Sequence, residues 1–357
     1  MAEEKHFEDV LLSVIEPLLA GLRVFERSAR YLAPGTMESI CGELFATRHD
    51  LRQASDGLRE TDWLPEATPI RNLVSEAYRH ALRSLESLDE VGTSTNDMMP
   101  IYRALGARAR VYEALFPLAS HFSLIHRFFL DSRRQDRARF SIADKASDSD
   151  LRGVHHVEND RKQRGGFSFY VPETYDANRS YPVVFALHGG SGHGSTFLWS
   201  WLRTARSEEL ILVSPTSVGG TWAIMGPDQD SPNLHGILES IRNIVNVDAS
   251  RLLLTGMSDG GTFTYVSGCT DESPFTHLSP CSASFHPLLI EMMSKERLNN
   301  LPICITHGVL DWMFTVDIAQ TAEYAFSAAG ANVLYREIAD LAHTYPEDLN
   351  PELIDWF

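Results

Sequence analysis

A serine in the second half of the chain stands in a pattern suited to nucleophilic chemistry. Ser258 lies in a Gly-x-Ser-x-Gly motif, residues 256–260, which follows the apolar run Leu252–Leu254 after one threonine. A strand that turns sharply into a helix through such a motif exposes the serine hydroxyl above the edge of a sheet. The flanking glycines leave room where strand and helix pass close together. The pattern predicts that Ser258 is a nucleophile.

A serine hydroxyl becomes a good nucleophile only when a base takes its proton and an acid orients that base. After a turn of this kind, the acid and then the histidine follow the serine along the chain, on loops behind later strands. Asp311 lies in the loop after the expected strand Ile303–His307. We therefore favour Asp311 as the acid over Asp317 and Asp340.

His343 is the candidate base. It follows the expected strand Val333–Ile338, and no histidine comes after it in the chain. His286 and His307 precede Asp311, so neither fits the order of serine, acid and histidine. Both are left as residues that line the pocket, support the site or belong to the core.

A glycine-rich turn follows the expected strand Tyr181–His188 and suits a further requirement of acyl transfer, which is a set of fixed donors for the oxyanion. One expected donor is the amide of Asp259, the residue after the nucleophile. The other is an amide of the turn, with Gly189, Gly190 and Ser191 as candidates. A phosphate-binding loop is the competing interpretation, but the turn lacks the Gly-Lys-Ser/Thr ending of such loops.

Four further residues near these loops are candidate substrate-binding residues. Trp222 follows the expected strand 210–214, Trp312 follows the candidate acid, and His188 and His286 lie at expected strand ends. Aromatic and polar side chains of this kind form the walls of ligand pockets. Ordinary core packing remains the alternative for each of them.

The elements that must position these residues alternate between strand and helix from residue 153 onward. The expected strands are 153–158, 167–171, 181–188, 210–214, 251–256, 283–286, 303–307 and 333–338. The expected helices are 196–207, 232–245, with Ser231 as its N-cap, and 318–329. Such alternation predicts an α/β domain, with a mainly parallel sheet covered by helices on both faces.

The first part of the chain has a different pattern. Residues 7–140 show apolar positions at helical spacing, beginning with Leu11, Ile15, Leu18 and Leu22, and no β-type alternation. We predict an all-helical N-terminal domain of about five helices over residues 1–140. A polar linker, 141–152, then leads to the α/β domain, 153–357.

Composition restricts the classes of function. The formal net charge of −17 disfavours nucleic acid and anionic membranes as partners. The first apolar segment carries too many charges for a signal peptide or a membrane span, so we expect a cytoplasmic protein. The four cysteines match no zinc or redox motif, and we expect free thiols, with a Cys269–Cys281 pair as the alternative.

The combined motifs resemble the α/β-hydrolase superfamily. Within it they look most like the esterase branch that holds polyhydroxybutyrate depolymerases, feruloyl esterases and related carboxylesterases. The resemblance covers residues 153–357 and rests on the segments 187–190, 221–222, 256–261, 307–311 and 343–346. It implies ester hydrolysis through an acyl-serine intermediate, with no cofactor and no metal. The helical N-terminal domain departs from the pattern of that branch.

These observations together predict a serine carboxylesterase. It would act on small or medium acyl or aryl esters, including soluble oligomers of polyesters. An aminopeptidase or acyl-peptide hydrolase that uses the same three residues is one alternative, and a catalytically inactive binding module is another. For the helical domain we expect a lid or a surface for homo-oligomerisation, with a stabilising appendage as the third alternative.

Overall fold

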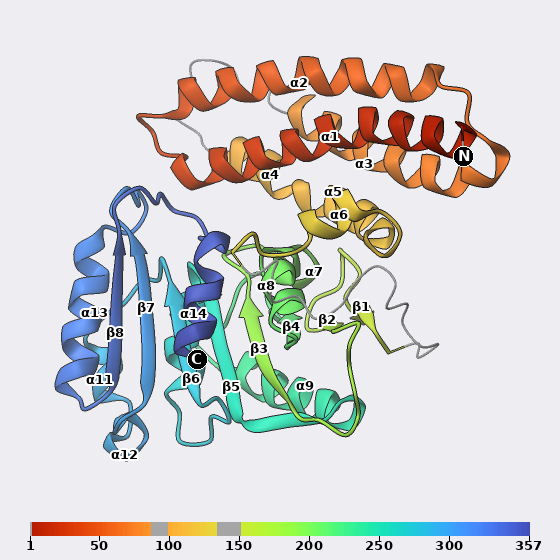
Figure 1. The fold of residues 1–357 in the computed structure, drawn as a ribbon. Helices are drawn as coiled ribbons and strands as arrows, with labels where there is room; N and C mark the ends of the chain where they lie inside the picture. The colour runs from red at the N-terminus through yellow and green to blue at the C-terminus, as the bar shows by residue number, and fades with distance from the viewer. Residues whose placement is uncertain (1, 87–98, 134–150) are drawn as a thin grey trace. The chain divides into compact units, whose positions relative to one another are not determined.

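The structure is a computed structural model that describes residues 2–86, 99–133 and 151–357 (Figure 1). Side chains in residues 2–10 are not among those described. The chain divides into two compact units, residues 1–129 and 130–357. Most of the predicted linker, 141–152, lies outside the described residues. The domain boundaries therefore stay predictions.

The first unit is helical throughout its described residues. Its elements are α1 (Ala2–Tyr31), α2 (Met37–Glu60), η1 (Pro65–Ala67), α3 (Thr68–Glu86), α4 (Met99–Gly106), α5 (Arg108–Leu115), η2 (Phe116–Ser120) and α6 (Ser123–Phe128). Helix α1 packs against α2, α2 against α3, and α3 against α5. The predicted apolar stripe of α1, from Leu11 to Leu22, is buried, whereas Leu12 lies off the stripe and is 41% exposed. Amphipathic helices of this kind are stabilised by burying one face against their neighbours.

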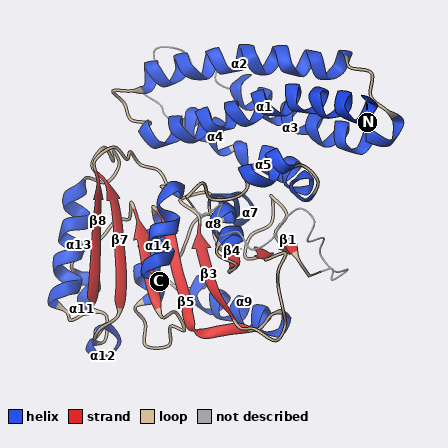
Figure 2. Ribbon diagram, in the orientation of Figure 1, coloured by secondary structure: helices blue, strands red, loops and turns tan. Residues whose placement is uncertain are grey.

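The second unit is built on an eight-stranded sheet, drawn in red in Figure 2. The strands are β1 (Gly153–Val157), β2 (Phe167–Val171), β3 (Tyr181–Leu187), β4 (Ile211–Pro215), β5 (Val247–Met257), β6 (His277–Cys281), β7 (Pro302–Gly308) and β8 (Asn332–Ile338). Their order is β1-β2-β4-β3-β5-β6-β7-β8. β1 and β2 run antiparallel to their neighbours, and all later pairs are parallel.

Helices flank this sheet (Figure 2). They are α7 (Gly194–Phe197), α8 (Leu202–Ser207), α9 (Asp230–Ile244), α10 (Asp259–Gly268), α11 (Leu288–Glu291), α12 (Lys295–Leu298), α13 (Val316–Ala328) and α14 (Asn350–Trp356), with short 3-10 turns η4 (Leu198–Ser200) and η5 (Glu347–Leu349). In β3 both alternating sets of side chains are buried, Val183 and Phe185 on one face and Val184 and Ala186 on the other. Since successive side chains of a strand point to opposite faces, both faces are covered. The predicted fold class is confirmed.

The predicted strand 283–286 is wrong. The strand of this region is β6, and the chain leaves the sheet at Ser282, which has a φ of +45°. The apolar residues after that point therefore belong to a loop. Ser279 and Pro280 gave β6 a composition that is unusual for a central strand, which is why the pattern pointed to the wrong residues.

Two predicted helices also differ from the structure. Segment 196–207 is interrupted by η4, and α9 starts at Asp230 instead of Pro232. Ser231 is not the N-cap, since it lies inside the first turn and its hydroxyl donates to Ser267 Oγ. The capping oxygen comes from Asp228, whose Oδ1 accepts from the amides of Asp230 and Ser231. An Asp two or three residues upstream can replace a serine cap because its carboxylate reaches the same amides.

Candidate active site

Ser258 stands at the turn between β5 and α10. Its φ of +56° and ψ of −120° lie in a region that non-glycine residues rarely adopt. The amide of Ser258 donates to the carbonyl of Cys281 at 2.9 Å, and its carbonyl accepts from the amide of Thr262 at 2.8 Å. These bonds hold the strained residue from both sides.

Close backbone packing explains the glycines of the motif. A Cβ atom on Gly256 would lie 2.4 Å from the carbonyl carbon of Gly260, and one on Gly260 would lie 2.5 Å from the carbonyl oxygen of His188. Neither neighbour can move away, because both are backbone atoms. Any side chain at these positions would separate β5 from α10 and from the loop after β3.

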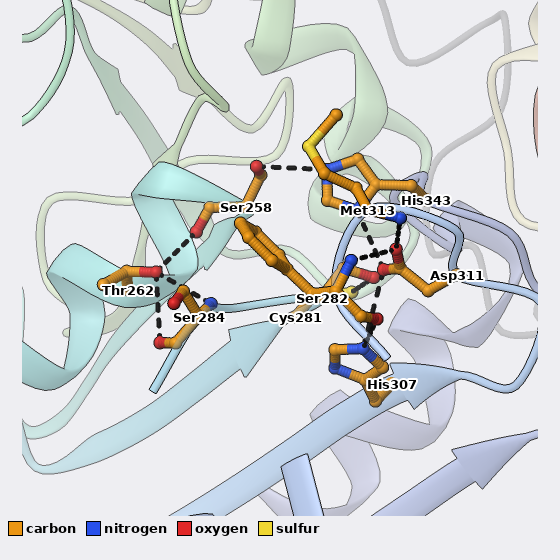
Figure 3. Close-up of polar contacts among 10 residues, drawn as sticks. Ser258, Thr262, Cys281, Ser282, Ser284, His307, Asp311, Met313 and His343 are labelled. Atoms are coloured by element: carbon orange, nitrogen blue, oxygen red, sulfur yellow. Dashed lines mark hydrogen bonds and ion pairs between the residues drawn. The ribbon is translucent and has the colours of Figure 1, made fainter. Parts of the chain in front are cut away.

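The structure brings Ser258, His343 and Asp311 together. His343 Nε2 lies 3.1 Å from Ser258 Oγ, and His343 Nδ1 lies 2.8 Å from Asp311 Oδ2 (Figure 3). The three side chains come from the loops after β5, β7 and β8. All three are buried, with Ser258 7% exposed. Asp311 accepts a hydrogen bond from Nδ1 of His343. The tautomer that suits this geometry carries its proton on Nδ1 and leaves Nε2 free to accept the serine proton.

The carboxylate of Asp311 is surrounded by donors. Its Oδ1 accepts from the amides of Met313 and Phe314, each at 2.9 Å, and its Oδ2 accepts from His343. Burial raises the pKa of Asp311, but these hydrogen bonds and the neighbouring imidazoles outweigh it and hold that pKa below its ordinary value. Asp311 is therefore a carboxylate at neutral pH.

His307 contacts the loop that carries Asp311. Its Nε2 donates to the carbonyl of Phe314 at 2.8 Å and lies 3.5 Å from Asp311 Oδ2 (Figure 3). The imidazole is 1% exposed. It therefore lies behind the acid rather than on a surface that a substrate could reach.

The glycine-rich segment after β3 forms a tight turn, residues 189–192, which we call the oxyanion turn. The amide of Gly192 donates to the carbonyl of Gly189 at 3.0 Å, and Ser191 has a φ of +56°. A Cβ on Gly189 would lie 3.6 Å from Ser258 Cβ, so the turn passes directly beside the serine. Within the described residues, the amides of Gly190 and Ser191 have no hydrogen-bond acceptor.

Asp259 begins α10 directly after Ser258. Its Oδ2 accepts from the hydroxyl of Thr221 at 2.5 Å and would lie 2.9 Å from a Cβ on Gly190. The side chain of Asp259 thus separates the oxyanion turn from Thr221, while its amide lies at the N-terminus of α10. Amides at that end of a helix carry a partial positive charge.

Two of the predicted substrate-binding residues are buried in the structure. His188 Nδ1 donates to the carbonyl of Gly189 at 2.7 Å, and its Nε2 accepts from the amide of Ser217 at 3.1 Å. Burial lowers the pKa of His188 to about 3, so the ring is neutral. Trp222 is 2% exposed, donates to the carbonyl of His188 at 2.7 Å and stacks on Phe263.

The other two lie at the surface. Trp312 is 38% exposed, and His286 is exposed with Nδ1 accepting from the amide of Leu288 at 3.3 Å. Substrate contact by these four residues stays a prediction. Their placement favours such contact for Trp312 and His286, whereas both ring nitrogens of His188 already have partners.

Sequence reasoning missed three residues that build the site. Thr262 Oγ1 contacts the carbonyl of Ser258 at 3.2 Å and accepts from the amide of Ser284 at 3.0 Å (Figure 3). Thr221 contacts Asp259, and Arg164 donates to the carbonyl of Gly192 in the oxyanion turn. Thr262 lies four residues after the serine and could have been found from helical spacing. Arg164 gave no signal beyond its place in a polar hairpin loop.

Comparison with known proteins finds esterases that are similar to part of this chain. Residues 228–350 match the family model described as phospholipase/carboxylesterase. A probable feruloyl esterase C of Aspergillus terreus is 30% identical over 156 residues, which cover 41% of this chain and 55% of that protein. A bifunctional acetylxylan esterase/xylanase of Neocallimastix patriciarum is 28% identical over a segment that covers 42% of this chain and 22% of that protein.

Among solved structures, a thermostable esterase has a TM-score of 0.45 and 17% identity, with coverage of 58% of this chain and 62% of that one. The chain spans about half the length of the feruloyl esterases it matches, 44% of the one from Aspergillus oryzae and 55% of the one from Aspergillus terreus. The second unit has the α/β-hydrolase fold, and part of it is similar in sequence to carboxylesterases and feruloyl esterases. The described residues contain no helix long and apolar enough to cross a membrane.

Proposed function

We propose that the protein is a serine carboxylesterase in which Ser258, His343 and Asp311 carry the reaction. The observation that supports this most directly is the continuous hydrogen-bonded path from Ser258 Oγ through both ring nitrogens of His343 to Asp311. A path of this kind activates a serine hydroxyl for attack on an acyl carbon.

In the first half-reaction, Ser258 Oγ attacks the ester carbonyl carbon and His343 Nε2 takes the hydroxyl proton. The carbonyl electron pair moves to the oxygen and gives a tetrahedral anion. When this anion collapses, the bond to the alcohol oxygen breaks, and His343 returns the proton to the departing alcohol. Asp311 keeps the imidazole in its orientation and stabilises its charged form.

The second half-reaction reverses these roles with water. His343 takes a proton from water while the water oxygen attacks the carbonyl carbon of the acyl-serine. When the resulting anion collapses, the bond to Ser258 Oγ breaks, His343 returns the proton to Oγ, and the carboxylic acid is released. In both halves the oxyanion accepts hydrogen bonds from the amide of Asp259 and from Gly190 or Ser191 in the oxyanion turn. Donors that are fixed in advance stabilise the transition state more than the substrate.

The proposed substrates are esters of small or medium acyl or aryl acids, with soluble polyester oligomers among them. The relatives named above are a feruloyl esterase and an acetylxylan esterase, and these names describe an ester of an aromatic acid and an ester of a short acyl group. Trp312 and Met313, 38% and 41% exposed beside Asp311, offer an apolar surface to either group. Apolar walls with a few fixed polar groups are typical of sites for such ligands.

A p-nitrophenyl ester series from acetate to palmitate, with methyl hydroxycinnamates alongside, tests the proposal. We expect turnover with an optimum at short or medium chains, and loss of turnover in Ser258→Ala. Hydrolysis of aminoacyl amides but of no ester would favour the peptidase alternative. Failure to react with any substrate or with a fluorophosphonate probe would favour the inactive binding module.

The role of the helical unit and the compartment are further proposals. The helical unit would serve as a lid or as a surface for homo-oligomerisation, and the enzyme would work in the cytoplasm. The four cysteines are free thiols, which supports a reducing compartment. Light scattering of the full chain and of residues 130–357 tests the helical unit. If the two proteins have the same oligomeric state and the same preference among esters, the helical unit would be a stabilising appendage.

A further inference from the structure

Arg164, in the loop between β1 and β2, spreads its guanidinium over five oxygen atoms of two other loops. Nε donates to the carbonyls of Ser217 and Gly219 at 3.1 and 2.9 Å. Nη1 donates to the carbonyl of Gly192 at 2.7 Å, and Nη2 donates to Ser217 Oγ and to the carbonyl of Gly220. All five acceptors are uncharged.

Gly192 is the last residue of the oxyanion turn, and the other acceptors belong to residues 217–223, which we call the Trp222 loop. Gly192 is therefore held at two atoms, since its amide closes the turn onto Gly189 and its carbonyl accepts from Arg164. A turn that is fixed at its closing residue cannot rotate its central amides away from Ser258. Those central amides are the ones proposed to hold the oxyanion.

The Trp222 loop is in turn attached to the rest of the unit. Asp230, which is fully buried at the start of α9, accepts from the amides of Val218 and Ala223 at 2.7 and 2.8 Å. The hydroxyl of Thr221 donates to Asp259. Arg164 thus connects the oxyanion turn to a loop that has its own anchors on α9 and beside the nucleophile.

We propose that Arg164 is a positioning residue for the oxyanion site, which it acts on through the carbonyl of Gly192 and the Trp222 loop. This inference rests on the proposed esterase function and adds a residue to it. The planar guanidinium offers five N–H donors in a fixed arrangement. A lysine offers three donors from one point and cannot reach both loops.

The experiment compares Arg164→Gln and Arg164→Lys with the parent enzyme on the same ester series. We expect kcat to fall about 10- to 100-fold, less than the loss of a whole oxyanion donor, while KM changes little. The affinity for an alkyl boronic acid, whose serine adduct is a tetrahedral anion, should fall in parallel with kcat. A purely structural role would lower the melting temperature without this parallel.

Arg297→Gln is the matched control. Arg297 also donates to backbone carbonyls, those of Gly268 and Phe275, and burial lowers its pKa as it does for Arg164. Gly268 is the last residue of α10, at the opposite end from Ser258. This variant should lose thermal stability and keep the parent kcat and boronate affinity.

The possible outcomes distinguish the proposed role of Arg164 from the proposed esterase function. Arg164 variants that match Arg297→Gln in kcat and boronate affinity would overturn the role of Arg164 and leave the esterase proposal intact. A parent enzyme that hydrolyses no ester and binds no boronate would overturn both. If Arg164→Gln does not fold, Ser217→Ala removes one of the five acceptors and should give a smaller loss of kcat in the same direction.

Discussion

The two sides of the active site are built in different ways. On the proposed acid–base side, three side chains from the loops after β5, β7 and β8 contact one another directly, and the atoms proposed to react belong to these side chains. On the oxyanion side the proposed donors are backbone amides. Side chains such as Arg164, His188 and Asp230 contact the backbone of Gly192, Ser217 and Val218, in the oxyanion turn and the Trp222 loop, and are not themselves the proposed donors.

This difference predicts two patterns of mutational effect. A side chain whose own atom reacts cannot be replaced, so its removal should abolish most of the rate. An amide that is held by several contacts should lose its position gradually, because the remaining contacts still hold it. The predictions below test this contrast, from the largest expected effect to the smallest.

Ser258→Ala and Asp311→Asn should each lower kcat by about 10⁴-fold or more, since one removes the nucleophile and the other favours the wrong imidazole tautomer. Steady-state hydrolysis of a p-nitrophenyl ester measures this. Ser258→Ala should also lose all labelling by a fluorophosphonate. Retention of more than a hundredth of the parent kcat by Asp311→Asn would assign the acid to another residue.

Gly190→Ala should lower kcat about 10- to 100-fold with little change in KM. The new Cβ would lie 2.9 Å from Asp259 Oδ2, so either the turn or Asp259 must shift. Gly236→Ala is the control, because a Cβ there meets no atom within 4 Å and alanine favours the helix. Equal kcat in both variants would exclude the oxyanion turn from the site.

His188 should make the fold sensitive to acid. Its pKa of about 3 in the folded protein lies below the ordinary 6.5, so the unfolded chain binds a proton that the folded protein does not. Stability is therefore complete above pH 6.5 and falls as the pH drops toward 3, by about 2 kcal/mol between pH 7 and 5.

His193 and His277 also have pKa values lowered by burial, so they also make stability depend on pH. Comparing the parent with His188→Gln isolates the contribution of His188. Urea unfolding at pH 7 and pH 5 should show a smaller loss in the variant than in the parent, by that same amount of about 2 kcal/mol. An identical loss in both proteins would mean that His188 is protonated in the folded state.

Thr221→Val should have the smallest effect, a loss of about 5-fold in kcat. It removes one hydrogen bond, from the Thr221 hydroxyl to Asp259, worth about 1 kcal/mol, and it keeps the shape of the side chain. Val218→Ala, in the same loop, leaves the Val218 amide bond to Asp230 intact and serves as the control. A larger loss in the control would place the sensitivity in loop packing rather than in the contact with Asp259.

Several features could be predicted from the sequence because they depend on local order along the chain. The alternation of strands and helices, the glycines around Ser258, and the positions of Asp311 and His343 in the loops after β7 and β8 are of this kind. Carboxyl ends of parallel strands meet at one edge of a sheet, so residues behind those strands come close together whatever the loop details.

The errors arose where local composition and tertiary context disagree. The segment 283–286 has strand-like residues, but Ser282 turns the chain away from the sheet. Ser231 looks like an N-cap, but Asp228 supplies the capping oxygen and Ser231 bonds to Ser267. In each case a neighbour outside the local pattern decided the structure.

The sequence by itself determined the class of fold and the candidate catalytic residues. The periodicity of apolar residues, the spacing of the glycines and the order of serine, acid and histidine can all be seen in the linear chain. Only the tertiary structure decided how the oxyanion turn is held. Arg164 acts on carbonyl oxygens of Gly192 and of residues 217–220, and every residue carries such an oxygen. No residue type marks those partners, so only the folded arrangement identifies them.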